Sequence, residues 1–271
     1  MMFGDINERG LVLLGCGKMG SALLQGWLAQ GLPPTRVWVS DPKPSEWVQA
    51  QGVHVNAPLP DAPAVVVVAV KPQIMGEALP RMQKLGNGRT IFVSIAAGTS
   101  IATFAEILGH STPIVRVMPN TPAAIGQGIA AIIGNRNATA KDVALAETLM
   151  QAVGDTLRLD TEDQMDAVTG VSGSGPAYVF HMIECLAAAG QAQGLSAELA
   201  MQLAQKTVAG AGALAVQSGE SPEQLRINVT SPNGTTQAGL DVLMKPRSGL
   251  KALINKTVAA ATERSKELSD D

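Results

Sequence analysis

Residues 11–20 read LVLLGCGKMG, and this stretch decides the fold of the N-terminal half. Its apolar start predicts a buried strand, and residues 19–30 have the apolar spacing of an amphipathic helix. In such a strand–turn–helix unit Gly15 permits the tight turn, Gly17 lets a pyrophosphate approach the backbone, and Gly20 lets the helix pack on the strand. The helix start offers amides and partial positive charge to phosphates. A plain turn is the alternative, but we interpret five residues as a dinucleotide-binding loop: Gly15, Gly17, Lys18, Met19 and Gly20.

The next predicted strand ends at Ser40 and Asp41, about 20 residues after the last glycine of the motif. An aspartate that accepts hydrogen bonds from the 2′- and 3′-hydroxyls of the adenosine ribose favours NAD. A 2′-phosphate would instead be repelled by Asp41 and attracted to Ser40, Lys43 and Asn56. If Asp41 simply caps a turn before Pro42, NADP is the better choice. Residue types therefore leave NADPH and NADH both open.

Short apolar runs alternate with amphipathic segments from residue 11 to about residue 159. This alternation is typical of an α/β domain with a doubly wound, mostly parallel sheet. Thr139 and Asp142 predict a capping box for a helix that runs to about Ala152. The predicted strands are Leu11–Leu14, Val37–Val39, Val65–Val70, Ile91–Ser94, Ile114–Val117, Ile129–Ile133 and Thr156–Leu159.

Three loops follow later strands of this predicted sheet. Open α/β sheets bind ligands at the carboxyl ends of their strands, so we expect these loops to line the cofactor groove. In the third loop Asn120 stands between two prolines, and its amide is a rigid polar group for the nicotinamide or the substrate, with a structural turn as the alternative. The expected lining residues are Ala69, Val70, Lys71, Pro72, Ala96, Ala97, Gly98 and Asn120.

The composition changes near Thr161, after which Ala-, Leu- and Gln-rich segments predict an all-helical second half. We therefore expect two domains, residues 1–161 and 162–271. Small residues recur in the helices and allow close backbone approach, which predicts a homodimer; packing within one chain is the alternative. The predicted helices are Glu162–Thr169, Pro176–Gln193, Ala197–Gln217, Pro222–Val229, Thr236–Met244 and Gly249–Leu268.

The overall composition argues against several classes of partner. Aromatic residues make up 3% of the 271 residues and the formal net charge is −3, so we expect no nucleic acid partner. We expect no membrane partner, because no apolar run reaches the about 18 residues of a membrane helix. Cys16 and Cys185 stand far apart and outside any metal-binding pattern, which favours reduced thiols, a cytoplasmic location and no metal. The three histidines are scattered and favour structural roles: His54, His110 and His181.

A second polar loop stands near the C-terminus, where residues 228–236 read NVTSPNGTT before a predicted helix. Free amides at a helix start, together with the hydroxyls of Ser231, Thr235 and Thr236, can hold a carboxylate without a basic side chain. An ordinary capped turn is the alternative.

Five segments, spread in order over nearly the whole chain, resemble motifs of the pyrroline-5-carboxylate reductases. They are residues 70–72 (VKP), 94–98 (SIAAG), 116–122 (RVMPNTP), 169–178 (TGVSGSGPAY) and 228–243 (NVTSPNGTTQAGLDVL). The resemblance implies a Rossmann-like domain, a helical substrate-binding and dimerisation domain, and reduction of 1-pyrroline-5-carboxylate to L-proline with NADPH or NADH. The chain differs at Asn233, where many relatives carry glycine, and at Asp41, where several carry a small or hydroxylic residue.

The resemblance also implies roles in the substrate loop. Thr236 is the candidate for the hydrogen bond to the imine nitrogen, and Ser231 with the amides of Gly234 and Thr235 is the candidate carboxylate site. Asn233 completes the predicted substrate-binding loop, and an interlocked dimer or higher homo-oligomer would let this loop serve the other subunit.

Two other functions remain open at this point. Lys251 and Asn255 have the spacing of a β-hydroxyacid dehydrogenase, although no glycine-rich run precedes Lys251. A non-catalytic dinucleotide-sensing module is the second alternative.

Overall fold

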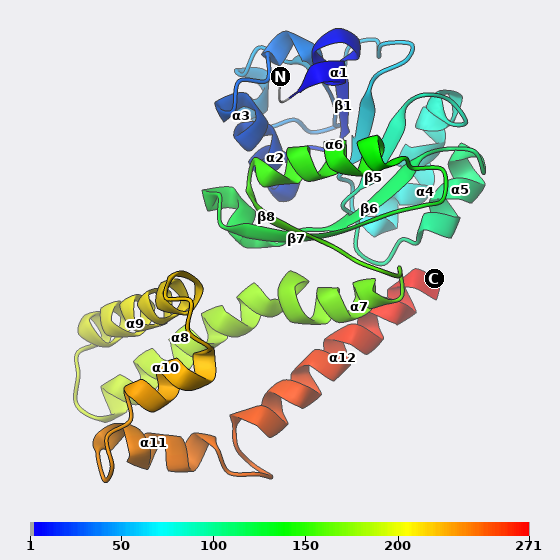
Figure 1. The fold of residues 1–271 in the computed structure, drawn as a ribbon. Helices are drawn as coiled ribbons and strands as arrows, with labels where there is room; N and C mark the ends of the chain where they lie inside the picture. Colours follow the sequence, from blue (N-terminus) through cyan, green and yellow to red (C-terminus); the bar gives the residue numbers. More distant parts are fainter. Residues whose placement is uncertain (1–2, 271) are drawn as a thin grey trace. The chain divides into compact units, whose positions relative to one another are not determined.

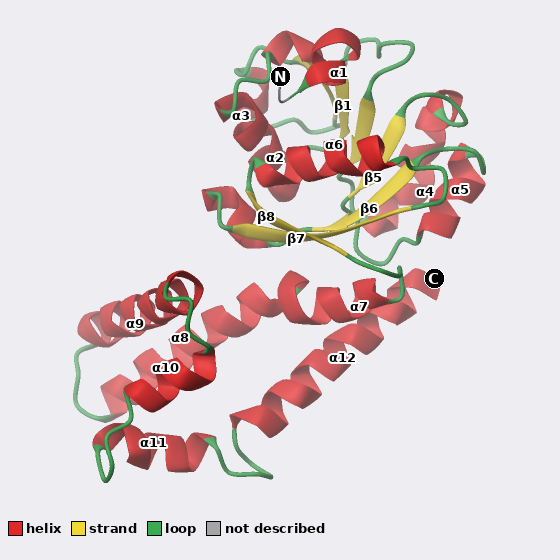
Figure 2. Cartoon of the chain, in the orientation of Figure 1, coloured by secondary structure: helices red, strands yellow, loops and turns green. Residues whose placement is uncertain are grey.

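Eight strands of the N-terminal half form one sheet in the order β3-β2-β1-β4-β5-β6-β7-β8. Figures 1 and 2 show this sheet with helices packed around it. Every neighbouring pair is parallel except β6 and β7, which run antiparallel. The predicted mostly parallel α/β sheet is therefore confirmed. The strands are β1 Leu11–Leu14, β2 Val37–Ser40, β3 His54–Val55, β4 Val65–Val68, β5 Ile91–Ser94, β6 Ile114–Met118, β7 Gly128–Gly134 and β8 Gly154–Arg158.

The computed structural model describes residues 3–270, and the side chains of residues 3–268. Within that range the chain divides into two compact units. The first contains the sheet up to Gly173 together with the segment that begins at Ala261, and the second contains Ser174–Ala260. The predicted functional division at residue 161 stays a prediction.

Alternate residues of the central strands point to opposite faces of the sheet and pack into two separate apolar cores. Leu11 and Leu13 belong to one core with Trp27, whereas Val12 and Leu14 belong to the other with Phe92. Burial of both strand faces explains why these strands are continuous apolar runs, as parallel strands covered by helices generally are. The first unit's helices and helical turns are α1 Gly4–Arg9, α2 Lys18–Ala29, η1 Pro34–Arg36, α3 Glu46–Gln49, η2 Pro72–Ile74, α4 Met75–Ala78, η3 Leu79–Leu85, α5 Ile101–Leu108, η4 Thr121–Ile125, α6 Ala140–Gln151, α7 Gln164–Val168 and the π-helical turn η5 Thr169–Gly173.

Most sequence-predicted elements agree with these bounds within about two residues. The capping box of α6 is confirmed, because the Thr139 hydroxyl accepts from Asp142 N and the Asp142 carboxylate accepts from Thr139 N. The sequence prediction extended strand β4 to Val70, but the strand ends at Val68 and its last two predicted residues form the loop beside the glycine motif. The two-residue edge strand β3 was not predicted, since so short a segment has no pattern of its own.

The secondary structure of the second unit consists of helices joined by short loops, and the unit has little core of its own. Its buried hydrophobic residues are Ala187, Ala200 and Ala204, where α8 and α9 approach closely. Large apolar side chains remain exposed on the same helices, including Leu203 and Val216. These exposed apolar side chains favour assembly with another chain, because a partner that covers them removes their apolar surface from water. The helices are α8 Gly175–Ala192, α9 Ala197–Gln217, α10 Pro222–Asn228, α11 Thr235–Leu243 and α12 Leu250–Asp270, whose last turns belong to the first unit.

Candidate active site

The glycine loop between β1 and α2 is packed too closely for side chains at two of its three glycines. Gly15 has φ +87°, and a Cβ there would lie 2.8 Å from Val70 Cγ1. A Cβ on Gly20 would lie 2.7 Å from Gly15 O, so the helix approaches the turn directly. A Cβ on Gly17, in contrast, would meet nothing within 4 Å. The loop is thus closely packed at Gly15 and Gly20 and open at Gly17. This shape leaves room for a pyrophosphate group beside the Gly17 backbone.

Helix α2 begins without a side-chain cap. Its N-cap is Gly17, and no described side chain accepts from its first-turn amides. Free amides and the helix dipole at such a start attract anions. Lys18 is the first helical residue and lines a groove of about 290 Å³, together with Ser21, Ala22, Gln25, Ser45, Trp47 and Ala124. The predicted residue Met19 lies half-buried in the same first turn.

Asp41 joins the glycine loop to the loop after β2. Its Oδ2 accepts from Cys16 N at 2.6 Å, and its Oδ1 accepts from Lys43 N at 2.7 Å. The aspartate therefore caps the turn before Lys43, but it also contacts the glycine motif. Asn56, in the left-handed region at φ +50°, holds the backbone of Asp41 through both its amide atoms, at 3.0 and 2.8 Å. The Asn56 side chain is thus engaged with the protein.

The remaining predicted cofactor residues lie at the same edge of the sheet, because the carboxyl ends of β2, β1, β4, β5 and β6 are parallel neighbours. Ser40 O accepts from Gly15 N at 2.8 Å, and Ala69 contacts the space beside Gly15. Ala96 N donates to the buried Ser94 Oγ. Val70, Lys71, Pro72, Ala97 and Gly98 belong to the same two loops, after β4 and β5.

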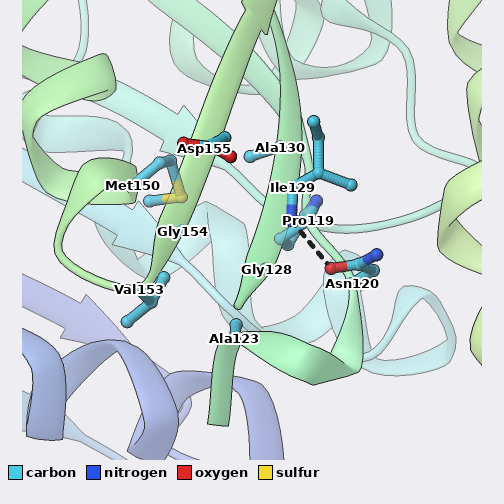
Figure 3. Close-up of a pocket in the computed structure, with 10 residues that line it drawn as sticks. All are labelled: Pro119, Asn120, Ala123, Gly128, Ile129, Ala130, Met150, Val153, Gly154 and Asp155. Carbon is cyan, nitrogen blue, oxygen red and sulfur yellow. Dashed lines mark hydrogen bonds between the residues drawn. The ribbon is translucent and has the colours of Figure 1, made fainter. Parts of the chain in front are cut away.

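Asn120 ends the loop after β6, and Figure 3 shows its surroundings. Its Oδ1 accepts from Ile129 N at 2.9 Å, which ties the loop to β7. The small cavity beside Asn120 has no room for a water molecule. The Oδ1 atom of Asn120 therefore serves to hold the loop and does not face a ligand pocket. The amide Nδ2 is the atom left to contact a ligand.

The cysteine of the glycine motif has a buried thiol with a raised pKa. Burial raises the pKa of the Cys16 thiol, a hydrogen bond with Ser21 lowers it, and the negative charge of Asp41 raises it. A raised pKa disfavours the thiolate, which is the reactive form of cysteine, so the environment gives no support for a nucleophilic Cys16.

The hydroxyl-rich segment of residues 229–236 lies in the second unit and spans the loop after α10 and the first two residues of α11. Asn233 adopts φ +59°, the left-handed conformation that asparagine tolerates. Gly234 N donates to Ser231 O at 3.0 Å, and Gly234 is the N-cap of α11 without a side-chain cap among the described residues. Ser231, Thr235 and Thr236 are exposed. The ordinary capped turn considered from the sequence is therefore absent here.

A buried arginine near the site was not identified from the sequence. Arg116 lies on β6 with its side chain 5% exposed, and its Nη1 donates to Glu162 Oε1 at 2.7 Å. The same oxygen accepts from Ile101 N at the start of α5, next to the loop of residues 94–98. This pair holds that loop against the segment before α7. An arginine inside the apolar run IVRVM was the signal that could have found it.

Other kinds of site receive no support in residues 3–270. No group of three or more potential metal ligands occurs among these residues. No described helix is long and apolar enough to cross a membrane. Lys251 and Asn255, the pair expected of a β-hydroxyacid dehydrogenase, are exposed on α12.

Comparison with known proteins identifies the family. Residues 162–268 match the family described as pyrroline-5-carboxylate reductase dimerisation, and residues 11–98 match NADP oxidoreductase coenzyme F420-dependent. The pyrroline-5-carboxylate reductase of Pseudomonas aeruginosa is 39% identical over 266 residues, covering 96% of this chain and 97% of the relative. The chain belongs to the pyrroline-5-carboxylate reductase family. It is an oxidoreductase dependent on NADPH or NADH, and the family reaction forms L-proline from 1-pyrroline-5-carboxylate in proline biosynthesis.

Solved pyrroline-5-carboxylate reductases have the same fold. A structure from Coxiella burnetii is 33% identical, with a TM-score of 0.90, and covers 97% of this chain and 99% of that one. A Plasmodium falciparum structure with NADP bound is 31% identical, with a TM-score of 0.85 and the same coverage. Membership of this reductase family decides against the two alternative functions, and its dimerisation domain implies a homo-oligomer.

Proposed function

We propose that this reductase binds the dinucleotide at the carboxyl edge of its sheet and the imino acid at the start of α11. The uncapped helix start at Gly234, flanked by exposed hydroxyls, is the observation that carries the substrate assignment. The uncapped start at Gly17 supports the assignment of the pyrophosphate. Both are helix N-termini that offer amide donors to an anion.

In the nucleotide half of the proposal, Gly15, Gly17 and Gly20 shape the loop and Lys18 adds positive charge. Asp41 and Ser40 meet the adenosine ribose, with Asn56 holding Asp41. Asn120 donates through Nδ2 to the nicotinamide or the substrate. The remaining lining residues are Met19, Lys43, Ala69, Val70, Lys71, Pro72, Ala96, Ala97 and Gly98.

In the substrate half, Ser231 and the amides of Gly234 and Thr235 hold the carboxylate of 1-pyrroline-5-carboxylate. Asn233 gives the loop its left-handed turn. Thr236 donates or relays a hydrogen bond to the ring nitrogen, which must carry a proton when the imine carbon accepts hydride. The bound dinucleotide supplies that hydride, and the protein contributes orientation and exclusion of water.

The last part of the proposal concerns the assembly of the chain into a homo-oligomer. The exposed apolar helices of the second unit support a homodimer, or a higher homo-oligomer built from it, in which the substrate loop of one chain serves the partner's nucleotide site. Residues 1–161 then form the dinucleotide-binding part, and residues 162–271 the substrate-binding and dimerisation part. Two free cysteines support a cytoplasmic location.

Thr236→Ala tests the catalytic assignment. We expect kcat to fall by about 10- to 100-fold, the usual effect of losing a hydrogen bond to a charged group. The dissociation constant of NADPH or NADH, measured by fluorescence titration, should stay unchanged, and Thr236→Ser should recover most of the rate. Thr148→Ala on α6 is the matched control, since its hydroxyl bonds only within its own helix, to Ala144 O. Unchanged turnover in Thr236→Ala removes this residue from the mechanism.

A further inference from the structure

We propose that Asp41 makes this reductase bind NADH more tightly than NADPH. The inference rests on the proposed placement of the pyrophosphate at the start of α2. Residue types alone left the cofactor open, because an aspartate at this position could have been no more than a turn cap. The hydrogen bonds of its carboxylate now separate the two cases.

The carboxylate of Asp41 is fixed against the glycine motif. Capping the turn requires only Oδ1, which accepts from Lys43 N at 2.7 Å. Oδ2 is not needed for the cap and accepts instead from Cys16 N, 2.6 Å away, inside the glycine loop. Asn56 clamps the backbone of Asp41 through two hydrogen bonds of 3.0 and 2.8 Å. The negative charge is therefore held where the adenosine ribose lies when pyrophosphate occupies the loop.

No cationic side chain of the described residues forms an ion pair with this carboxylate. The ion pairs of residues 3–268 do not include Asp41, and Lys43 contacts it only through its backbone N–H. A half-buried carboxylate without a paired cation repels a neighbouring phosphate more strongly than it would in bulk water.

The two nucleotides differ at the atom that meets this carboxylate. The 2′- and 3′-hydroxyls of NADH can donate to Oδ1 and Oδ2, because each carboxylate oxygen accepts more than one hydrogen bond. NADPH replaces the 2′-hydroxyl with a phosphate that carries between about 1.5 and 2 negative charges near neutral pH and offers mainly acceptors. The same carboxylate thus attracts one nucleotide and repels the other.

The test is direct binding of each nucleotide, by isothermal titration calorimetry of the full-length protein without substrate. We expect wild-type protein to bind NADH at least about 10-fold more tightly than NADPH, a difference of about 1.4 kcal/mol. Asp41→Asn keeps an acceptor for Lys43 N and removes the charge. It should bring the ratio of dissociation constants close to one or reverse it.

Glu46→Gln is the matched control, because it removes one negative charge from the exposed start of α3, close to Asp41 in sequence. It should leave the ratio unchanged. Circular dichroism and thermal melts establish that all variants are folded. Equal or tighter NADPH binding by the wild type, or an unchanged ratio in folded Asp41→Asn, overturns the inference while the proposed function stands. Binding of neither nucleotide by the wild type overturns both.

Discussion

The starts of α2 and α11 share one local feature and differ in their surroundings. Each helix follows a glycine N-cap without a side-chain cap among the described residues. Four other helices, α1, α4, α7 and α8, also lack a side-chain cap in the described part of the chain, but their N-cap residues are not glycine. Hydroxyl side chains cap five helices: Ser45 for α3, Ser100 for α5, Thr139 for α6, Ser196 for α9 and Ser221 for α10. A missing cap leaves amide donors unsatisfied unless water or a ligand takes them. Both proposed ligand loops therefore begin helices whose donors are free.

The surroundings of the two loops are different. The loop before α2 stands on a sheet that is buried on both faces, and its glycines contact Val70 and neighbouring backbone directly. The loop before α11 is exposed, in a unit whose buried apolar residues are three alanines. One chain thus builds the glycine loop by its own packing, whereas the proposed substrate loop lies in a unit with little core of its own.

The largest expected effect comes from making the same substitution in both loops. Gly20→Ala places a methyl group 2.7 Å from Gly15 O, so backbone must move. We expect a loss of about 1–3 kcal/mol in the free energy of unfolding, as overpacking usually causes. Nucleotide binding should weaken by about 100-fold, or about 2.7 kcal/mol.

Gly234→Ala is the counterpart, where the new methyl would lie 3.0 Å from Ser231 O at an ordinary φ of −83°. Thermal melts and nucleotide titrations should detect little change in this variant. If Gly20→Ala and Gly234→Ala lower the free energy of unfolding by the same amount, the two loops do not differ in packing.

A smaller effect is expected at the apolar surface of the second unit. Leu203 is 50% exposed and lines a groove of about 160 Å³ with Leu186, Gly190, Leu195, Ala200, Ala204 and Thr207. Leu203→Lys puts a charge into a contact that should be apolar, so we expect the dissociation constant of the oligomer to rise by about 10-fold, or about 1.4 kcal/mol.

Analytical ultracentrifugation over a range of concentrations measures this change, and Leu203→Met is the apolar control. Nucleotide affinity should be the same in both variants, while turnover in Leu203→Lys should fall upon dilution. Turnover that is insensitive to dilution would mean that the substrate loop is complete within one chain.

The sequence predicted the elements of both units well, because each has a strong local signal. Apolar runs such as VVVV mark buried parallel strands, and Ser or Thr before an apolar period marks a helix start. The second unit's helices, such as Ala197–Gln217, agree closely with prediction for the same reason. The glycine loop was recognisable because its residue spacing is itself the structural requirement.

Contacts between distant residues could not be predicted. Asp41 was assigned two competing roles, and only its bond to Cys16, 25 residues earlier, shows that it does more than cap a turn. Arg116 and Glu162 are 46 residues apart, and nothing local indicates that one oxygen of Glu162 serves both Arg116 and the start of α5. The sequence motifs give the residues of a site, whereas the partners of each side chain depend on tertiary packing.

The smallest effect is expected where neither loop is involved, at the pair of Glu147 on α6 and Arg158 on β8. Arg158 donates to the Glu147 carboxylate through Nε and through Nη2, each at 2.6 Å. These hydrogen bonds lower the pKa of Glu147 from its usual 4.5, whereas partial burial raises it and the charge of Arg158 lowers it further. A carboxyl whose pKa is lower in the folded state stabilises the protein above its unfolded-state pKa, and this contribution disappears as the pH falls through the folded-state pKa.

Wild type and Glu147→Gln should therefore differ in melting temperature at pH 7 and converge as the pH falls below 4.5. The difference should be close to the error of the measurement, because the Arg158 side chain is 57% exposed and solvent screens such pairs. Nucleotide affinity should be the same in both proteins at pH 7. A change in nucleotide affinity would mean that the glycine loop responds to the stability of the whole sheet. The different effects of substitutions in the two loops would then reflect global stability and not local packing.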